Sequence, residues 1–204
     1  RGYRVRATLR DHVYAQSESF AYLSRLQNAS ELLEVVPLDL LADSNDSSWR
    51  TAFADVEYVM HVAGPVTSYD EDPENNIIKP IVQGTETILE YCQNTPTVKK
   101  LVMTSCMCAM TDVFEMGKKY DETCWNDTAT PTQSIYSYSK TTAERDAVRA
   151  AMSEEASFQL TSILPGTILG AHLGKKMSHS HTFFRNISMR NGKNKGIVNI
   201  SLAI

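Results

Sequence analysis

Two tyrosines and a lysine lie close together in the stretch SIYSYSK, residues 134–140. Tyr136 precedes Lys140 by four positions, and Tyr138 precedes it by two. On a helix, residues four apart share a face, whereas residues two apart do not. If the stretch is helical, Tyr136 and Lys140 therefore project together and Tyr138 points elsewhere.

A phenol beside an ammonium group is suited to proton transfer. A free tyrosine has a pKa of about 10, so half-ionisation at neutral pH requires a shift of about 3 units, or roughly 4 kcal/mol. An ammonium at about 4 Å, in an effective dielectric near 20, contributes about that amount. We therefore expect Lys140 to lower the pKa of Tyr136 and make the phenol a usable general acid and base. The spacing alone is a weak signal, because any helix can contain it by chance.

Strands and helices alternate along the chain. Short apolar runs closed by turn residues predict strands, and longer segments with helical periodicity or propensity predict helices. This alternation is typical of an α/β fold of the Rossmann type, a doubly wound parallel sheet with helices on both faces. The expected strands are 2–11, 31–40, 56–65, 99–105, 158–170 and 196–204, and the expected helices are 19–27, 44–53, 72–95 with a bend at Pro80, 136–156 and 181–191.

Polar residues and glycines follow five of the predicted strands. In doubly wound sheets, ligands bind at the carboxyl ends of the strands, so these residues predict a nucleotide site along one edge. They are Arg10-Asp11, Asp39-Leu40, Ala63-Gly64-Pro65, Thr104-Ser105 and Pro165-Gly166-Thr167.

The end of the first strand bears on the choice of cofactor. An acidic side chain there accepts the ribose hydroxyls of NAD, whereas an arginine pairs with the 2′-phosphate of NADP. Arg10 followed by Asp11 is ambiguous: we expect NADP if Arg10 ends the strand, and NAD is the alternative. Arg10 as a merely solvated strand end is the remaining interpretation.

No GxGxxG turn occurs in the chain. Such a turn would lie in the first strand–helix pair of the βαβ unit, upstream of Arg1. We therefore expect residues 1–170 to be an N-terminally truncated dinucleotide-binding domain, and 171–204 to be the start of a substrate-binding region whose larger part is missing.

Composition excludes several classes of protein. The 204 residues are 42% hydrophobic and 22% charged, with a net charge of −4, which fits a globular protein and does not suggest nucleic-acid binding. No apolar run is long enough for a membrane span. The four cysteines contain no CxxC pair, which favours reduced thiols in a cytoplasmic protein. His179 and His181 lack a third nearby ligand, so we expect no metal.

Several segments, in order and spacing, resemble the extended short-chain dehydrogenase/reductases, within the NAD-dependent epimerase/dehydratase superfamily. The branch that they resemble contains dihydroflavonol reductases, cinnamoyl-CoA reductases and fungal carbonyl reductases. The matching segments are GYRVRATLRD, FADVEYVMHVAGPV, IIKPIVQGTETILE, KKLVMTS, YSYSKTTAE and ILPGTILG.

The resemblance implies an enzyme that transfers a hydride between NADP(H) and a small ketone, aldehyde or alcohol, and that acts as a monomer or homodimer. It implies that Tyr136 is the acid/base and Lys140 its electrostatic partner. It also implies a set of cofactor contacts: Arg10 with the 2′-phosphate, Asp39 and Leu40 with the adenine, Val62, Ala63 and Gly64 with the ribose and pyrophosphate, Thr104 beside them, and Pro165, Gly166, Thr167 and Ile168 around the nicotinamide.

One position departs from the family pattern. The family usually reads Thr-Ser-Ser after this strand, with the second serine bonded to the substrate oxygen, whereas this chain reads Thr104-Ser105-Cys106. A thiol is a weak donor, and alternation along an extended segment directs Ser105 away from the position of Cys106. Three outcomes are open: Cys106 serves less efficiently, a local shift brings in Ser105, or the protein is a weak catalyst. Cys106 as a packing residue is the plainer interpretation.

Two other functions remain open at this point. The chain could be a dinucleotide-binding regulatory module without turnover, for which Cys106 and the missing glycine-rich turn are the motivation. It could also be a sugar-nucleotide epimerase or dehydratase, because those enzymes share the Tyr-x-x-x-Lys helix.

Overall fold

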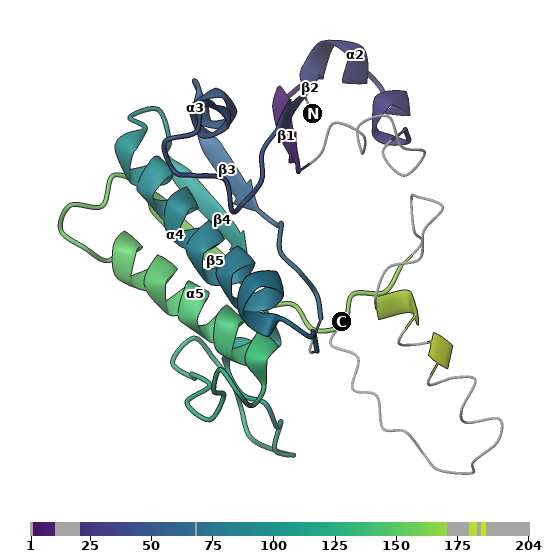
Figure 1. Ribbon diagram of the computed structural model, residues 1–204, viewed down its shortest axis with the longest axis vertical. Coiled ribbons are helices and arrows are strands. Elements are labelled where there is room, and N and C mark those ends of the chain that lie inside the picture. Colours follow the sequence, from purple (N-terminus) through teal and green to yellow (C-terminus); the bar gives the residue numbers. More distant parts are fainter. Residues whose placement is uncertain (1, 11–20, 68, 171–179, 183–184, 187–204) are drawn as a thin grey trace.

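A computed structural model describes residues 2–10, 21–67, 69–170, 180–182 and 185–186. Within them, parallel strands form two separate groups (Figure 1). Asp11, His179, the predicted strand at 196–204 and most of the predicted helix at 181–191 lie outside the described residues.

The first group pairs β1 (Val5–Leu9) with β2 (Leu33–Pro37) in parallel, from Val5 opposite Leu33 to Leu9 opposite Pro37. The connection between them contains a 3₁₀ turn, η1 (Leu23–Arg25), and a one-turn helix, α2 (Ala29–Leu32). The helix expected over 19–27 is thus reduced to η1 in its described part. Asn28, with φ 63°, stands in the left-handed region between the two turns, a conformation that asparagine tolerates better than most residues.

The second group contains β3 (Tyr58–His61), β4 (Lys100–Thr104) and β5 (Gln159–Ile163), in the order β3-β4-β5. All pairs are parallel, with Tyr58 opposite Lys100 and Lys100 opposite Gln159. Strands β3 and β5 end two residues before Ala63 and Pro165, and β4 ends at Thr104 itself. The three strand ends therefore meet at one edge, as the alternating pattern predicted.

Three α-helices connect these strands: α3 (Ser47–Phe53), α4 (Lys79–Asn94) and α5 (Ile135–Ala151). A π-helical turn, η2 (Glu74–Ile78), runs directly into α4. Pro80 lies in the first turn of α4, where its fixed φ suits the start of an α-helix. The helix thus changes from π to α just before Pro80, the residue at which the sequence predicts a bend.

Helices α4 and α5 lie side by side over one face of the β3-β4-β5 group (Figure 1). The opposite face carries exposed apolar side chains, with Tyr58 57%, Met60 71% and Ile163 51% accessible. The described residues thus cover one face of this sheet, where the sequence predicts helices on both.

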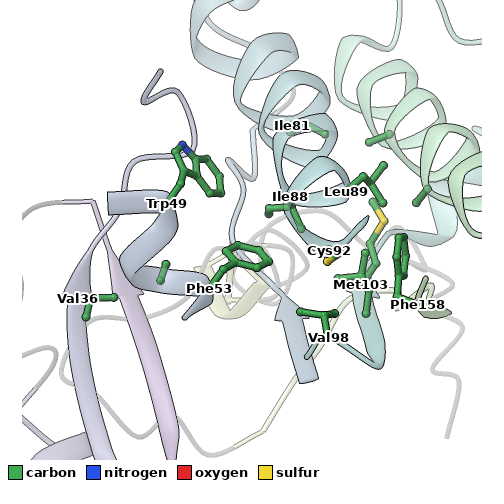
Figure 2. Packing of buried hydrophobic residues seen from close by; sticks show 14 of the residues in the cluster. Val36, Trp49, Phe53, Ile81, Ile88, Leu89, Cys92, Val98, Met103 and Phe158 are labelled. Atoms are coloured by element: carbon green, nitrogen blue, oxygen red, sulfur yellow. The ribbon is translucent and has the colours of Figure 1, made fainter. Parts of the chain in front are cut away.

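The core fills the space between the strands and α3, α4 and α5 (Figure 2). Trp49 of α3 is fully buried and stacks on Tyr91 of α4, with ring centroids 5.4 Å apart. Phe53 packs against the same tyrosine at 5.1 Å. Leu101 and Met103 of β4 point into this core and are almost inaccessible. The aromatic cluster ties α3, which follows the first group of strands, to α4, which covers the second.

The facing edges of β1 and β3 are not joined to each other in the described part of the chain. A cavity of about 340 Å³ lies between them, and its walls include β1, β3, Trp49, Phe53 and Ile88. The single sheet expected from the alternation is therefore divided in two, because none of the described residues supplies a strand between these edges.

Two methionines on neighbouring strands test this division into a covered and an open face. Met103 is 1% exposed and Met60 is 71% exposed. Because a buried methionine loses packing and leaves a cavity, Met103→Ala is expected to lower the free energy of unfolding by about 2–5 kcal/mol, and Met60→Ala by no more than about 0.5 kcal/mol. Denaturant titration of both variants measures the difference. Equal losses would contradict the assignment of faces.

Candidate active site

Helix α5 brings Tyr136 and Lys140 together. Lys140 is buried, with 7% of its surface exposed, and its Nζ is 5.9 Å from the centre of the Tyr136 ring. Nζ also donates a hydrogen bond to the backbone carbonyl of Thr104 at the end of β4, at 3.1 Å. The prediction that these two side chains share a face is confirmed, and the ammonium joins α5 to the carboxyl edge of the sheet.

Cys106 stands two residues beyond β4, in an extended conformation with φ −155°. It precedes the 3₁₀ turn η3 (Met107–Ala109), and its Sγ accepts the backbone N–H of Cys108 at 3.4 Å. Its thiol also interacts with the side chains of Tyr136 and Lys140. Cys106 is therefore the residue of the Thr-Ser-Cys stretch that faces the tyrosine and the lysine.

Ser105 points the other way. Its hydroxyl donates to a carboxylate oxygen of Glu144, and the hydroxyl of Ser162 donates to the other oxygen at 2.8 Å. Ser105 and Glu144 are both buried. The structure thus does not bring Ser105, a candidate catalytic residue, to Tyr136, and the possibility that a local shift does so is not realised. Alternation along the strand is the physical reason.

Glu144 is a residue that sequence reasoning missed. It ties the end of β4 to β5 through the two serines and lies one turn beyond Lys140 on the same helix face. Its carboxylate favours the charged form of Lys140. The repeated four-residue spacing of Tyr136, Lys140 and Glu144 is the signal that could have found it.

The Lys140 ammonium acts chiefly on the thiol rather than on the phenol. Hydrogen bonds from the side chain and the backbone N–H of Cys108, together with the charge of Lys140, lower the pKa of Cys106 to about 6, although burial opposes this shift. Burial and the negative charge of the Cys106 thiolate raise the pKa of Tyr136 well above its usual value. The expectation that Lys140 lowers the pKa of Tyr136 is therefore wrong here, because burial of the phenol and the charge of the nearby Cys106 thiolate both favour the protonated form.

Lys140 is itself perturbed. Burial lowers its pKa, and the negative charges of Cys106 and Glu144 oppose that shift. Within the described residues, its ammonium makes one hydrogen bond, to Thr104. Since an ammonium has three N–H donors, two remain for a bound molecule. This donor capacity fits the ribose hydroxyls of a dinucleotide.

His61, the last residue of β3, lies beneath the same site. Burial and the charge of Lys140 lower the pKa of His61 to about 4. The hydroxyl of Thr85 donates to the carbonyl of Ile81 at 2.6 Å, so we assign Nε2 of His61 as the donor to Thr85, 3.1 Å away. A polar residue at the end of a buried strand is the sequence signal that could have found it.

Two glycines shape the edge of the site. A Cβ added to Gly64 would lie 4.0 Å from Nζ of Lys140, so this glycine brings the chain after β3 close to the ammonium. A Cβ added to Gly166 would lie 2.7 Å from Sδ of Met107, too close for an undisturbed fit. The N–H of Met107 also donates to the carbonyl of Pro165 at 3.1 Å. The turn after β5 is thereby fastened to η3.

The remaining predicted cofactor residues lie at or near strand ends. Arg10 is exposed just after β1, and Asp39 follows β2, where its side chain accepts the N–H of Leu41 at 2.9 Å. Leu40 packs closely against Gly84 of α4. Five others lie around the carboxyl ends of β3 and β5, namely Val62, Ala63, Thr167 and Ile168, which are exposed, and Pro165, which is half-buried.

Two absences concern the part of the chain that the structure describes. It contains no cluster of three histidine, cysteine or acidic side chains that could hold a metal ion. None of its helices has the length and apolar character needed to cross a bilayer.

His181 lies near the end of the described chain, with a ring nitrogen 2.5 Å from the carbonyl oxygen of Gly170.

Comparison with known proteins agrees with this arrangement. Residues 2–201 match the NAD dependent epimerase/dehydratase family. The chain belongs to this family. The resemblance to dihydroflavonol reductases is confirmed by relatives such as a dihydroflavonol 4-reductase of Hordeum vulgare, 35% identical over 88% of the chain and 50% of the relative, and a putative anthocyanidin reductase of Ginkgo biloba, 32% identical over 83% and 50%.

Solved structures give the same fold. Vestitone reductase from alfalfa (Medicago sativa) is 27% identical and matches 88% of this chain and 54% of its own, with a TM-score of 0.67. Yeast methylglyoxal/isovaleraldehyde reductase complexed with NADPH is 24% identical, with 83% and 52% covered and a TM-score of 0.65, which shows the Rossmann-type fold alone. The family member thus spans about half the length of the curated relatives and solved structures that it matches.

The depressed pKa of His61 predicts a pH-dependent loss of stability. Between about pH 6.5, where a free histidine titrates, and about pH 4, its value in the fold, the unfolded state binds a proton that the folded state does not. Stability therefore falls as the pH falls through this window, by about 3 kcal/mol when complete. His61→Gln keeps a donor for Thr85 and removes the titration. Denaturant unfolding at pH 7 and pH 4 is expected to show a smaller loss for this variant than for the natural chain, whereas equal losses would exclude His61 as the source.

Proposed function

We propose that this chain forms the cofactor-binding part of a reductase that transfers a hydride between NADP(H) and a small ketone, aldehyde or alcohol. The observation that carries the proposal is the buried Lys140 ammonium between Thr104 and Tyr136, at the edge where three parallel strands end. Family membership supports the reaction class. Arg10, exposed at the end of β1, supports a 2′-phosphate contact and hence NADP.

The nicotinamide, when bound, would supply or accept the hydride. In the reducing direction, the hydroxyl of Tyr136 donates its proton to the carbonyl oxygen of the substrate, and Lys140 stabilises the phenolate that this leaves. The two further N–H donors of Lys140 hold ribose hydroxyls. While it is protonated, the Cys106 thiol beside the phenol would donate a weak hydrogen bond to the substrate oxygen, at the position where the family has a hydroxyl. Each role uses a side chain already directed into the site.

The acidic thiol sets a limit on this chemistry. A Cys106 thiolate stabilises the proton on Tyr136 and raises the pKa of the phenol. A phenol with a raised pKa is a poorer proton donor near neutral pH. The site therefore supports slow turnover while Cys106 is ionised.

The same observation favours a second candidate function, a dinucleotide-binding module without turnover. Lys140 and the open strand edge would still hold the cofactor, while the Cys106 thiolate keeps Tyr136 protonated. Cofactor binding without turnover across a panel of aldehydes and ketones would identify this module. A tightly held cofactor that cycles without net oxidation would instead indicate a sugar-nucleotide epimerase or dehydratase.

Tyr136→Phe tests the assigned acid. In the full-length protein that contains this chain, the substitution is expected to lower kcat by about 10²–10⁴, because a positioned proton donor contributes that factor. NADPH binding should change little, since Lys140 remains. Tyr138→Phe is the matched control two residues away and is expected to retain activity. Cofactor absorbance with a carbonyl panel measures the rates; equal rates for the two variants would exclude Tyr136 as the acid.

Cys106→Ser tests the thiol at the substrate-facing position. A serine hydroxyl donates a stronger hydrogen bond than a thiol and does not ionise. We therefore expect kcat to rise by at least about tenfold, below the roughly 10²–10³ that a complete oxyanion donor contributes. Ser105→Ala is not a suitable control, because it would leave buried Glu144 short of a partner. A fall in kcat for Cys106→Ser would show that the thiol itself is required.

A further inference from the structure

Cys106 and Cys108 form a pair of interacting thiols beside a buried cation. The backbone N–H of Cys108 lies 3.4 Å from Sγ of Cys106, and the two side chains interact with each other. Lys140 and Tyr136 adjoin them. Both cysteines are half-buried, so a small molecule can reach them. Proton transfer from Tyr136 makes no use of a second thiol.

We propose that Cys106 is a peroxide-reactive thiol and Cys108 its resolving partner, and that the two close a reversible disulfide beside Lys140. This modification is independent of the proposed reductase reaction, because it requires neither cofactor nor carbonyl substrate.

The local backbone permits the bond. Met107, between the two cysteines, begins the 3₁₀ turn η3, and a helical residue folds two steps of about 3.8 Å into a shorter Cα–Cα distance. With three residues per turn and a rise of about 2.0 Å per residue, a 3₁₀ conformation places Cα atoms two residues apart about 5 Å from each other, within the roughly 4.4–6.8 Å that disulfides span. A ring closed over a single intervening residue is strained, and strained disulfides are readily reduced. The geometry therefore favours a switchable bond over a permanent one.

The charges around the pair decide which sulfur attacks. With a pKa of about 6, Cys106 is mostly thiolate at neutral pH, and the thiolate is the reactive form. It attacks hydrogen peroxide, so that an S–O bond forms and the O–O bond breaks. The sulfur loses two electrons to become a sulfenic acid, and the departing hydroxide takes a proton from solvent to give water.

Cys108 completes the reaction. Its hydrogen bond to Cys106, burial and the Cys106 charge together hold its pKa above the usual range. Oxidation removes the charge of Cys106, so the pKa of Cys108 falls toward its ordinary value. The Cys108 sulfur then attacks the sulfenic sulfur, an S–S bond forms, the S–O bond breaks, and the hydroxyl leaves as water with the thiol proton. A dithiol reductant donates two electrons to the disulfide and returns both cysteines to thiols. The reductant itself becomes a disulfide.

Oxidation would also change the phenol. The thiolate charge is one cause of the raised pKa of Tyr136, and a disulfide carries no charge. Lys140 is then left to act on the tyrosine, so the pKa of Tyr136 falls on oxidation. The redox state of the pair thereby sets the acidity of the neighbouring phenol.

The other cysteine of the core provides a contrast. Cys92 is fully inaccessible, and burial raises its pKa to about 12. It is therefore expected to be inert toward peroxide while the chain is folded. Its protection also serves as an internal report that the fold is intact.

Tryptic peptides separate these thiols: 51–99 contains Cys92, 101–118 contains Cys106 and Cys108, and 120–140 contains Cys124. The full chain is treated with hydrogen peroxide, alkylated and analysed by mass spectrometry. Peptide 101–118 is expected to lose the mass of two hydrogen atoms, and dithiothreitol is expected to restore it. Oxidation confined to the Cys124 peptide, or no loss of mass from 101–118, would overturn the proposal.

Two variants separate the attacking thiol from the resolving thiol. In Cys108→Ser, the disulfide cannot form and a sulfenic acid on Cys106 should be trapped by dimedone. In Cys106→Ser, thiol oxidation of the same peptide should slow by at least about tenfold, because the low-pKa thiolate is gone. Cys124→Ser is the matched control and should oxidise at the natural rate. Trapping on Cys108 at the natural rate in Cys106→Ser would overturn the assignment.

A variant in which Cys92 becomes alkylated has unfolded and cannot test the proposal. The test is then made on the unsubstituted chain, by measuring how the rate of Cys106 alkylation by iodoacetamide depends on pH. A half-maximal rate near pH 6 supports the proposal, whereas one near the ordinary thiol value of about 8.5 overturns it.

Discussion

A buried ammonium organises this site. Lys140 is 7% exposed, and a buried charge is costly unless neighbouring groups compensate for it. The compensation comes from the Thr104 carbonyl and from the negative charges of Cys106 and Glu144. These groups belong to β4, the turn after it and α5 itself. Burying the Lys140 ammonium therefore requires α5 and the end of β4 to keep fixed positions relative to each other.

The Lys140 ammonium lies near two acidic groups, the Cys106 thiol and the Tyr136 phenol. Only the pKa of Cys106 is lowered. Cys106 also receives hydrogen bonds from Cys108 and reaches its charged form first. Once it is ionised, its charge opposes ionisation of Tyr136. A serine at this position would not compete, because its hydroxyl does not ionise near neutral pH. The difference between the two residues is therefore electrostatic as much as it is a difference in hydrogen-bond strength.

The sequence predicts the positions of side chains here better than their acidity. Four-residue spacing placed Tyr136 beside Lys140, and alternation after β4 directed Ser105 away from the site occupied by Cys106. The sign of the pKa shift at Tyr136 could not be predicted, because it depends on how deeply the phenol is buried and on a thiol thirty positions earlier in the chain. The parallel direction of the strands could also be predicted, whereas their order and the gap between β1 and β3 could not, since alternation does not reveal which strands are neighbours.

Glu144 holds β4 and β5 to α5 without using the side chain at position 106. The two serine hydroxyls that hold β4 and β5 to α5 come from Ser105 and Ser162, on the side of the backbone opposite Cys106. Ser105 thus anchors the strand to the helix, while the adjacent Cys106 points to the opposite side and faces the reactive groups. An exchange of cysteine and serine at position 106 would alter reactivity without loosening the sheet. Lineages could therefore move between a redox-sensitive and an insensitive form of this fold by a single nucleotide change.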